Sequence, residues 1–164
     1  MPSPGYFAER VIRIVESPQS DLFSDADRKE ITGREFTVSA RRNRMGTGLE
    51  SKDFAFEALA GLTLASDAIV PGDIQIAGDG SATVLMADSQ PVGGYPRLAT
   101  VITADQRKLA QIPSGERFRM QWISSAEAIE ALRGLCRKKS ELVNRLDTFK
   151  RDPSRMKDLL PYSR

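Results

Sequence analysis

Hydrophobic residues recur at every second position in several short segments, which residues typical of turns separate. Residues 9–16 (ERVIRIVE) are rich in β-branched side chains, and residues 34–40 and 116–123 alternate apolar with polar side chains. The alternating apolar residues are Phe36, Val38 and Ala40 in one segment and Phe118, Met120 and Trp122 in the other. This periodicity is typical of β-strands that bury one face.

The clearest local structure is a predicted β-hairpin in residues 73–87. The apolar segments DIQIA and SATVLMA follow the Pro71-Gly72 turn signal and flank the turn sequence GDG. Residues 98–103 (LATVIT) form a nearly continuous apolar run, as expected of a strand buried on both faces. Many short strands with few helices predict a mainly β protein with a closed β-barrel.

Three segments carry helix signals. Ser24 and Asp27 resemble a capping arrangement for a short helix over residues 25–31, and Thr103 is a candidate cap for residues 104–111. A longer amphipathic helix is predicted from Ser125 to a point before Pro153. The sequence thus predicts a barrel over residues 1–124 and a helical tail over residues 125–164.

The long predicted helix has an apolar stripe, which needs a partner surface. The stripe consists of Ile129, Leu132, Cys136, Val143 and Leu146. A straight helix of this length would extend past a barrel of about 125 residues. We therefore predict a homo-oligomer or another docking contact through this helix. In the alternative interpretation, Gly134 breaks the helix and its second half folds back on the barrel.

The composition excludes several kinds of chemistry. The chain has no histidine and one cysteine, Cys136, so Ser-His-Asp catalysis, Cys-His catalysis, an internal disulfide and a zinc site are not expected. No apolar run approaches the roughly 20 residues that span a bilayer, and the N-terminus does not resemble a secretion signal. These features predict a cytoplasmic protein without a membrane contact.

The charge of the chain is unevenly distributed. Residues 125–164 hold ten Lys or Arg against six Asp or Glu, a balance of +4 within a chain of net charge +2. A basic tail can contact nucleic acid, but this one lacks interleaved aromatic residues and a recognised motif. We therefore predict a solvated helix face or a protein contact, and no nucleic-acid partner.

Two stretches carry a family resemblance that covers about residues 9–124. The first is SPQSDLF with the segments EFTVSA and NRMGTGLE, and the second runs from IVPGDIQIAGDGSATVLMADSQPVGGYPR to LATVITADQRKLAQIPSGERFRM. They resemble the C-terminal part of the allophanate hydrolase subunit 2 family. This carboxyltransferase-like family includes the bacterial 5-oxoprolinase C subunit and the carboxyltransferase part of urea carboxylase. Members normally carry about a hundred further residues before this region.

The resemblance implies a fold, a function and partners. It implies a cyclophilin-like β-barrel and a carboxyltransferase-like subunit that acts with an allophanate hydrolase subunit 1 homologue on 5-oxoproline or a small amide or urea-like substrate. ATP or biotin would be bound by partner subunits and no cofactor by this chain. Three polar positions depart from the family pattern: Ser17 replaces a glycine, Gly48 replaces an arginine, and Pro91-Val92 replaces Thr-Thr. These departures leave open a non-catalytic regulatory or interaction module.

The loop over residues 88–97 supplies most of the candidate substrate-binding residues, and no catalytic residue is assigned. The candidates are Asp88, Gln90, Gly93, Gly94, Tyr95 and Arg97, together with Arg44 from the Arg-Met-Gly motif. The glycines would let backbone N–H groups approach a ligand, and arginine suits a carboxylate. Alternatively, Gly-Gly-Tyr-Pro is a tight barrel corner.

Two of these groups have further interpretations of their own. Asp88 would serve as a general base only if burial raised its pKa; otherwise it would anchor backbone N–H groups. Arg41, Arg42 and Arg44 form either an anion clamp or a solvated turn, and of the three only Arg44 belongs to the resembled motif. Gln19, in the SPQ turn, is a weaker ligand candidate.

Overall fold

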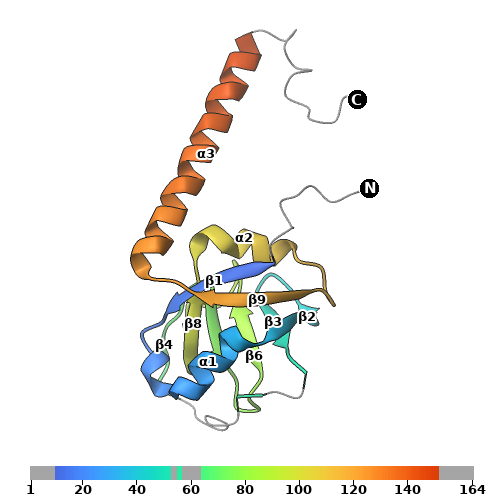
Figure 1. Ribbon diagram of the computed structural model, residues 1–164, viewed down its shortest axis with the longest axis vertical. Coiled ribbons are helices and arrows are strands. Elements are labelled where there is room, and N and C mark those ends of the chain that lie inside the picture. Colours follow the sequence, from blue (N-terminus) through green and yellow to red (C-terminus); the bar gives the residue numbers. More distant parts are fainter. Residues whose placement is uncertain (1–9, 53–54, 57–63, 152–164) are drawn as a thin grey trace. The chain divides into compact units, whose positions relative to one another are not determined.

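The computed structural model describes residues 10–52, 55–56 and 64–151, with side chains as far as residue 146. It confirms a mainly β fold with a closed barrel and a C-terminal helix (Figure 1). The strands are β1 (Val11–Glu16), β2 (Glu35–Arg42), β3 (Gly46–Glu50), β4 (Asp67–Ala68), β5 (Asp73–Ile76), β6 (Ala82–Leu85), β7 (Val92–Gly93), β8 (Arg97–Val101) and β9 (Arg117–Trp122). The helices are α1 (Asp25–Gly33), α2 (Thr103–Gln111) and α3 (Ser125–Arg151), with a 3₁₀ turn at Ser20–Leu22.

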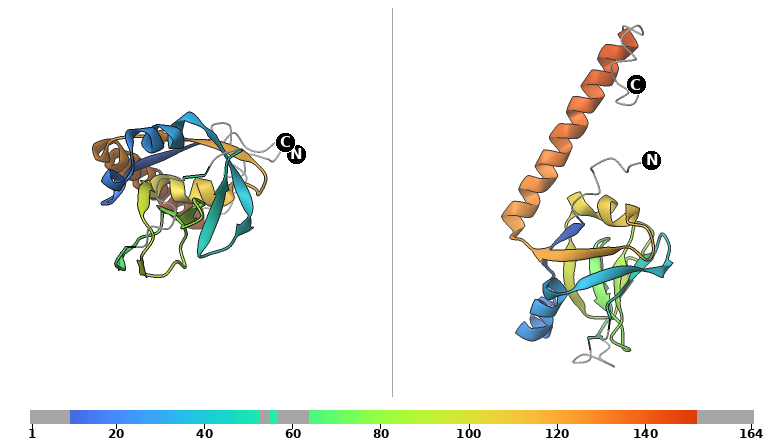
Figure 2. Two further views of the ribbon diagram at one scale, coloured as in Figure 1. Left: turned by 90° about the horizontal axis from the view of Figure 1, so that it is seen from below. Right: turned by 45° about the vertical axis from the view of Figure 1, so that its right-hand side comes forward.

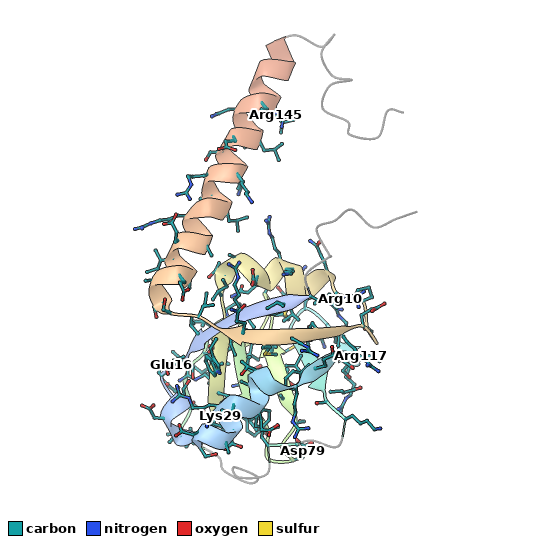
Figure 3. The ribbon with its side chains drawn as sticks, in the orientation of Figure 1. Arg10, Glu16, Lys29, Asp79, Arg117 and Arg145 are labelled. Carbon is teal, nitrogen blue, oxygen red and sulfur yellow. The ribbon has the colours of Figure 1, made fainter. Side chains whose placement is uncertain are left out.

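Seven strands close the barrel in the order β1-β8-β5-β6-β3-β2-β9. Neighbouring strands are antiparallel except at the seam, where β9 returns to pair in parallel with β1, with Val11 opposite Arg119 and Ile14 opposite Trp122. Arg10 and Arg117, labelled in Figure 3, mark the adjacent starts of these two strands. The first and last strands of the barrel, β1 and β9, therefore pair with each other and close it.

The inward-facing side chains form one apolar core. Its largest fully buried members include Phe36 and Phe118, whose rings lie 6.3 Å apart, and Leu98. Helix α2 covers one end of the barrel, and α1 packs outside against β9 (Figures 1 and 2). Trp122 is only partly buried and donates its indole N–H to the carbonyl of Arg28 at 2.9 Å.

The alternation predicted for β2 fails after Val38. Ser39 is buried and Ala40 is exposed, the reverse of the expectation from sequence. The cause is a bulge: Val38 pairs with Leu49 and Arg42 with Thr47, so residues 39–41 face Gly48 alone. A Cβ at Gly48 would lie 3.2 Å from the carbonyl oxygen of Arg41, which explains why glycine fits this position.

The predicted β5–β6 hairpin and the capped helix α1 are both confirmed. Gly80 adopts a positive φ of 78° in the hairpin turn. Ser24 and Asp27 form a reciprocal capping box at the start of α1. The prediction for α2 was wrong in one detail: Ile102 is the N-cap and Thr103 is the first helical residue, with no side-chain cap.

Helix α3 is continuous from Ser125 to Arg151, so Gly134 does not break it. The helix begins with a reciprocal contact in which the N–H of Glu127 donates to Ser124 Oγ and the N–H of Ser124 donates to the Glu127 carboxylate. The chain divides into two compact units, Met1–Ala128 and Ile129–Arg164. The tail predicted beyond Pro153 lies outside the described residues. No described helix combines the length and apolarity that a membrane crossing requires.

Candidate functional site

The loop between β6 and β8 is joined to the turn that carries Arg44. The N–H of Met86 donates to the carbonyl of Met45, and the N–H of Asp88 donates to the carbonyl of Arg44, both at 2.9 Å. The turn itself is held by Asn43, whose side-chain oxygen accepts from the N–H of Met45 at 2.8 Å. The structure therefore brings Arg44 and the first half of the predicted binding loop together.

Arg44 and Asp88 form a bidentate ion pair at this junction. Arg44 Nη2 donates to Asp88 Oδ1 at 2.9 Å, and Arg44 Nε donates to Asp88 Oδ2. The hydrogen bond from Arg44 lowers the pKa of Asp88, and the same contact raises the pKa of Arg44. The condition for Asp88 to act as a general base, a pKa raised by burial, is therefore not met.

Gln90 lines a pocket of about 590 Å³ beside this ion pair. The pocket is open to solvent, and its wall consists of Ala40, Arg41, Arg42, Asn43, Met45, Gly46, Gly48, Leu49, Ser81, Ala82, Thr83, Leu85 and Gln90. The size is within the range of small-molecule sites. Gln90 and Arg41 are among the lining residues, and their side chains carry an amide and a guanidinium, groups that can bind carbonyl or carboxylate oxygens.

The three arginines of this turn do not form one anion clamp. Arg42 donates to the carbonyl of Ala110 at 2.6 Å and to that of Ile112, at the end of α2. Arg44 is engaged by Asp88. Arg41 lines the pocket, and its guanidinium makes no hydrogen bond to another described residue. These neighbouring arginines therefore make three different contacts: Arg42 binds the end of α2, Arg44 binds Asp88, and Arg41 lines the pocket.

The second half of the loop forms a small ribbon on the outside of the barrel. In β7, Val92 pairs with Ala68 and Gly93 pairs with Asp67 of β4. The carbonyl of Gly94 accepts a hydrogen bond from the N–H of Leu64 at 2.7 Å. Tyr95 is exposed at the end of this ribbon. Along the loop, β7 therefore lies between Asp88 and Gln90, which are on the side of Arg44, and Gly94 and Tyr95, which follow β7.

Arg97 lies at the start of β8 with only 5% of its side chain exposed. Its Nε donates to Gln19 Oε1 at 3.2 Å, Nη1 donates to the carbonyl of Ala68 at 2.6 Å, and Nη2 donates to the carboxylate of Asp67. Asp73, which is buried, lies 3.6 Å from Nη1. All three guanidinium nitrogens thus donate hydrogen bonds within the chain, so Arg97 connects Gln19, Asp67 and Ala68.

With this geometry established, comparisons with known proteins identify the family. The model of the carboxyltransferase domain, subdomain A and B, matches residues 1–122. The chain belongs to the carboxyltransferase domain family.

Two curated members are similar to much of this chain. The 5-oxoprolinase C subunit of Escherichia coli is 34% identical over 120 residues, which cover 73% of this chain and 38% of that protein. The Haemophilus influenzae protein of the same name is 32% identical over 123 residues, 75% of this chain and 39% of its own length. The chain thus spans less than two fifths of either relative.

Solved structures of low sequence identity show the same fold. The urea carboxylase of Kluyveromyces lactis superposes with a TM-score of 0.64 at 20% identity, over 78% of this chain and 12% of that one. A conserved uncharacterized protein from Pyrococcus horikoshii superposes with a TM-score of 0.52 at 16% identity, over 72% of this chain and 60% of that one.

Several polar residues of this carboxyltransferase domain were missed by the sequence reasoning. Asp67, Asp73 and Gln75 meet around Arg97 although they were not candidates, and Gln19, a weak candidate, accepts two hydrogen bonds from Arg97. The alternation of Asp73 and Gln75 with Ile74 and Ile76 is a signal that could have found two of these outward-facing polar positions, but no local signal shows that a ribbon covers them. Among the described residues, no group of three or more His, Cys, Asp or Glu could hold a metal ion.

Proposed function

We propose that this chain is a component of a 5-oxoprolinase- or carboxylase-type complex, in which it positions a small substrate that carries a carboxylate or an amide. The observation that carries the proposal is the similarity to the 5-oxoprolinase C subunit over 120 residues. The pocket beside Gln90 supports it, because an amide and a neighbouring arginine suit a small polar ligand. 5-Oxoproline, which has both a carboxylate and a lactam amide, is the first substrate to test.

In this proposal the chain binds the substrate, and the partner supplies the groups that transfer protons. The chain has no histidine, and the hydrogen bond from Arg44 lowers the pKa of Asp88 further below its ordinary value, which disfavours a protonated Asp88. The proposed positioning groups are Gln90, which lines the pocket, together with Arg97 and the amides of the Gly93-Gly94 segment, which lie outside that lining. Arg97 would contact a substrate only in place of one of its present partners. The contribution of these groups would be orientation, which can account for a large part of a catalysed rate.

The proposed partner is an allophanate hydrolase subunit 1 homologue in the cytoplasm, with ATP or biotin bound by partner subunits. A second contact is proposed for α3, through which two copies of the chain associate. Its exposed side chains include Ile129, Leu132, Cys136, Val143 and Leu146, which follow one another at intervals of three, four, seven and three residues. That spacing matches the seam of a helical coiled coil.

A regulatory or interaction module without activity is the second candidate. The residues that depart from the family pattern have structural contacts of their own: Ser17 donates its hydroxyl to the carbonyl of Arg97 at 2.6 Å, and Gly48 fits the β2 bulge. Function depends on the site and not on the fold, so a domain that keeps its strands while its polar loops change need not keep the activity of its family.

The test is to purify the chain with the partner and measure ATP-dependent turnover of 5-oxoproline and of urea. We expect turnover of 5-oxoproline by the complex, and we expect Gln90→Ala to lower kcat/KM at least about tenfold. Gln121→Ala is the matched control, because Gln121 is exposed on β9 and does not line the pocket. If the complex turns over neither substrate, the regulatory candidate replaces the catalytic one.

A further inference from the structure

A buried polar cluster lies beneath the β4–β7 ribbon on the outside of the barrel. Gln75 of β5 pairs with Arg97 of β8, and one extra residue in β8, Leu98, keeps both side chains on the same face. Gln75 is 6% exposed, and its Nε2 has no hydrogen-bond partner among the described residues. A buried amide N–H₂ without an acceptor is costly in a folded protein, so its retention needs an explanation.

The ribbon closes directly over this amide. A Cβ added to Gly93 would lie 2.8 Å from Gln75 Nε2 and 3.1 Å from Ile69 Cδ1, so glycine is what allows the close approach. The ribbon is small, with two residues in each strand. An isolated two-stranded ribbon is marginally stable, so its hold over Gln75 depends on the contacts it makes below.

One of those contacts is an ion pair of unequal burial. Arg97 is 5% exposed, whereas Asp67 on the ribbon has 55% of its side chain exposed. Asp73, at 3.6 Å from Arg97 Nη1, is buried and remains beside the guanidinium whether or not Asp67 does. The carboxylate of Asp67 is therefore the accessible and replaceable partner of Arg97.

We propose that Arg97 and Gln75 form a subsite for the carboxylate of a small ligand, and that Asp67 occupies this subsite when no ligand is bound. The incoming carboxylate displaces Asp67 from Arg97 Nη2 and accepts a second hydrogen bond from Gln75 Nε2. Displacement releases one anchor of the ribbon. No covalent step is involved. The choice of 5-oxoproline as ligand rests on the proposed function, whereas the subsite rests on the geometry alone.

Asp67→Asn in the full chain is the decisive variant. It keeps the size of the side chain and removes the competing charge. We expect it to bind 5-oxoproline and acetate about tenfold more tightly than the unmodified chain by isothermal titration, as the loss of a competing charge-assisted contact implies. Asp25→Asn is the control: it removes the same charge at an exposed position of α1 and leaves the affinity unchanged.

The role of Gln75 is tested in the Asp67→Asn background. Gln75→Leu removes the unpaired amide, and we expect it to abolish the tenfold gain without lowering the thermal midpoint of the free chain. Gln75→Glu places a carboxylate beside Arg97 and should also block binding, which provides a second reading if the leucine variant fails to fold. Equal affinity of Asp67→Asn and the unmodified chain, or a gain that survives both changes at Gln75, overturns the proposal.

The two proposals fail in different ways. Carboxylate binding that responds to Asp67 and Gln75, without turnover by the complex, leaves the subsite standing and removes the catalytic function. Turnover by the complex, with a binding affinity that does not respond to Asp67→Asn, supports the catalytic function and removes the subsite.

Discussion

Replacing Asp105 with asparagine will test how the barrel holds α2. Asp105 is 4% exposed and accepts three hydrogen bonds from Arg13: from its N–H at 2.9 Å, from Nε at 2.9 Å and from Nη2 at 2.7 Å. The asparagine carbonyl can still accept two of them, but its N–H₂ group would face the third donor. The charge is also lost.

The cost of Asp105→Asn follows from these contacts. Breaking a buried ion pair typically costs about 3–5 kcal/mol, but 38% of the Arg13 side chain is exposed, so solvent screening reduces the charged part. We therefore expect a loss of about 2–3 kcal/mol at pH 7, or a Tm lowered by roughly 10 °C for a domain of this size. Urea unfolding at pH 7 measures it.

The pH dependence gives this prediction its sharper test. Burial alone would raise the pKa of Asp105, but hydrogen bonds from the side chain and backbone of Arg13 outweigh burial and lower it. A carboxyl group whose pKa is lower in the folded state contributes its full stability above its unfolded pKa of about 4. That contribution is lost as the pH falls through the lower folded value.

The difference in unfolding free energy between the native chain and Asp105→Asn should therefore shrink below about pH 4. Asp25→Asn, an exposed first-turn change in α1, should cost less than about 1 kcal/mol. A difference for Asp105→Asn that is the same at pH 7 and pH 3 would show that packing, and not the charge on Asp105, holds the contact.

Two further predictions concern α3. Gly134→Ala should stabilise α3 by about 0.5–1 kcal/mol, because alanine is the better helix former and a Cβ there would meet only Arg137 Nη2 at 3.7 Å. Thermal melting followed by circular dichroism measures this change, and an unchanged or lower midpoint contradicts the prediction. Leu146→Asp should convert a self-associated chain to monomers in sedimentation velocity, because it places a charge in the exposed apolar stripe; a native chain that sediments as a monomer refutes the proposed self-association.

Local signals predicted the parts of the fold that depend on neighbouring residues. The capping pair Ser24 and Asp27 and the turn at Gly80 are set within a few residues, and both were predicted. The exchange of Ser39 and Ala40 between faces was not, because the bulge depends on the register against β3. Alternation along one strand carries no information about how many residues its partner supplies.

The sequence placed the candidate site residues in two loops but did not predict their geometry. The pairing of Arg44 with Asp88 joins residues of two loops, and no pattern within either loop indicated it. Arg97 was predicted to face a ligand, whereas the structure surrounds it with Gln19, Asp67 and Asp73. These contacts arise because the short β4–β7 ribbon folds over β5 and β8, and strands of two residues leave no periodic signal.

Because β9 pairs with both β1 and β2, the barrel cannot close until the last of its strands is present. A ribosome-bound chain that has not yet released residues 117–122 has every other barrel strand, but the free edges of β1 and β2 remain open. Such edges are templates for pairing with other chains. Because Val11 must find Arg119 across almost the whole domain, closure is a late, high-contact-order event. The last strand therefore converts an aggregation-prone open sheet into a barrel without edges.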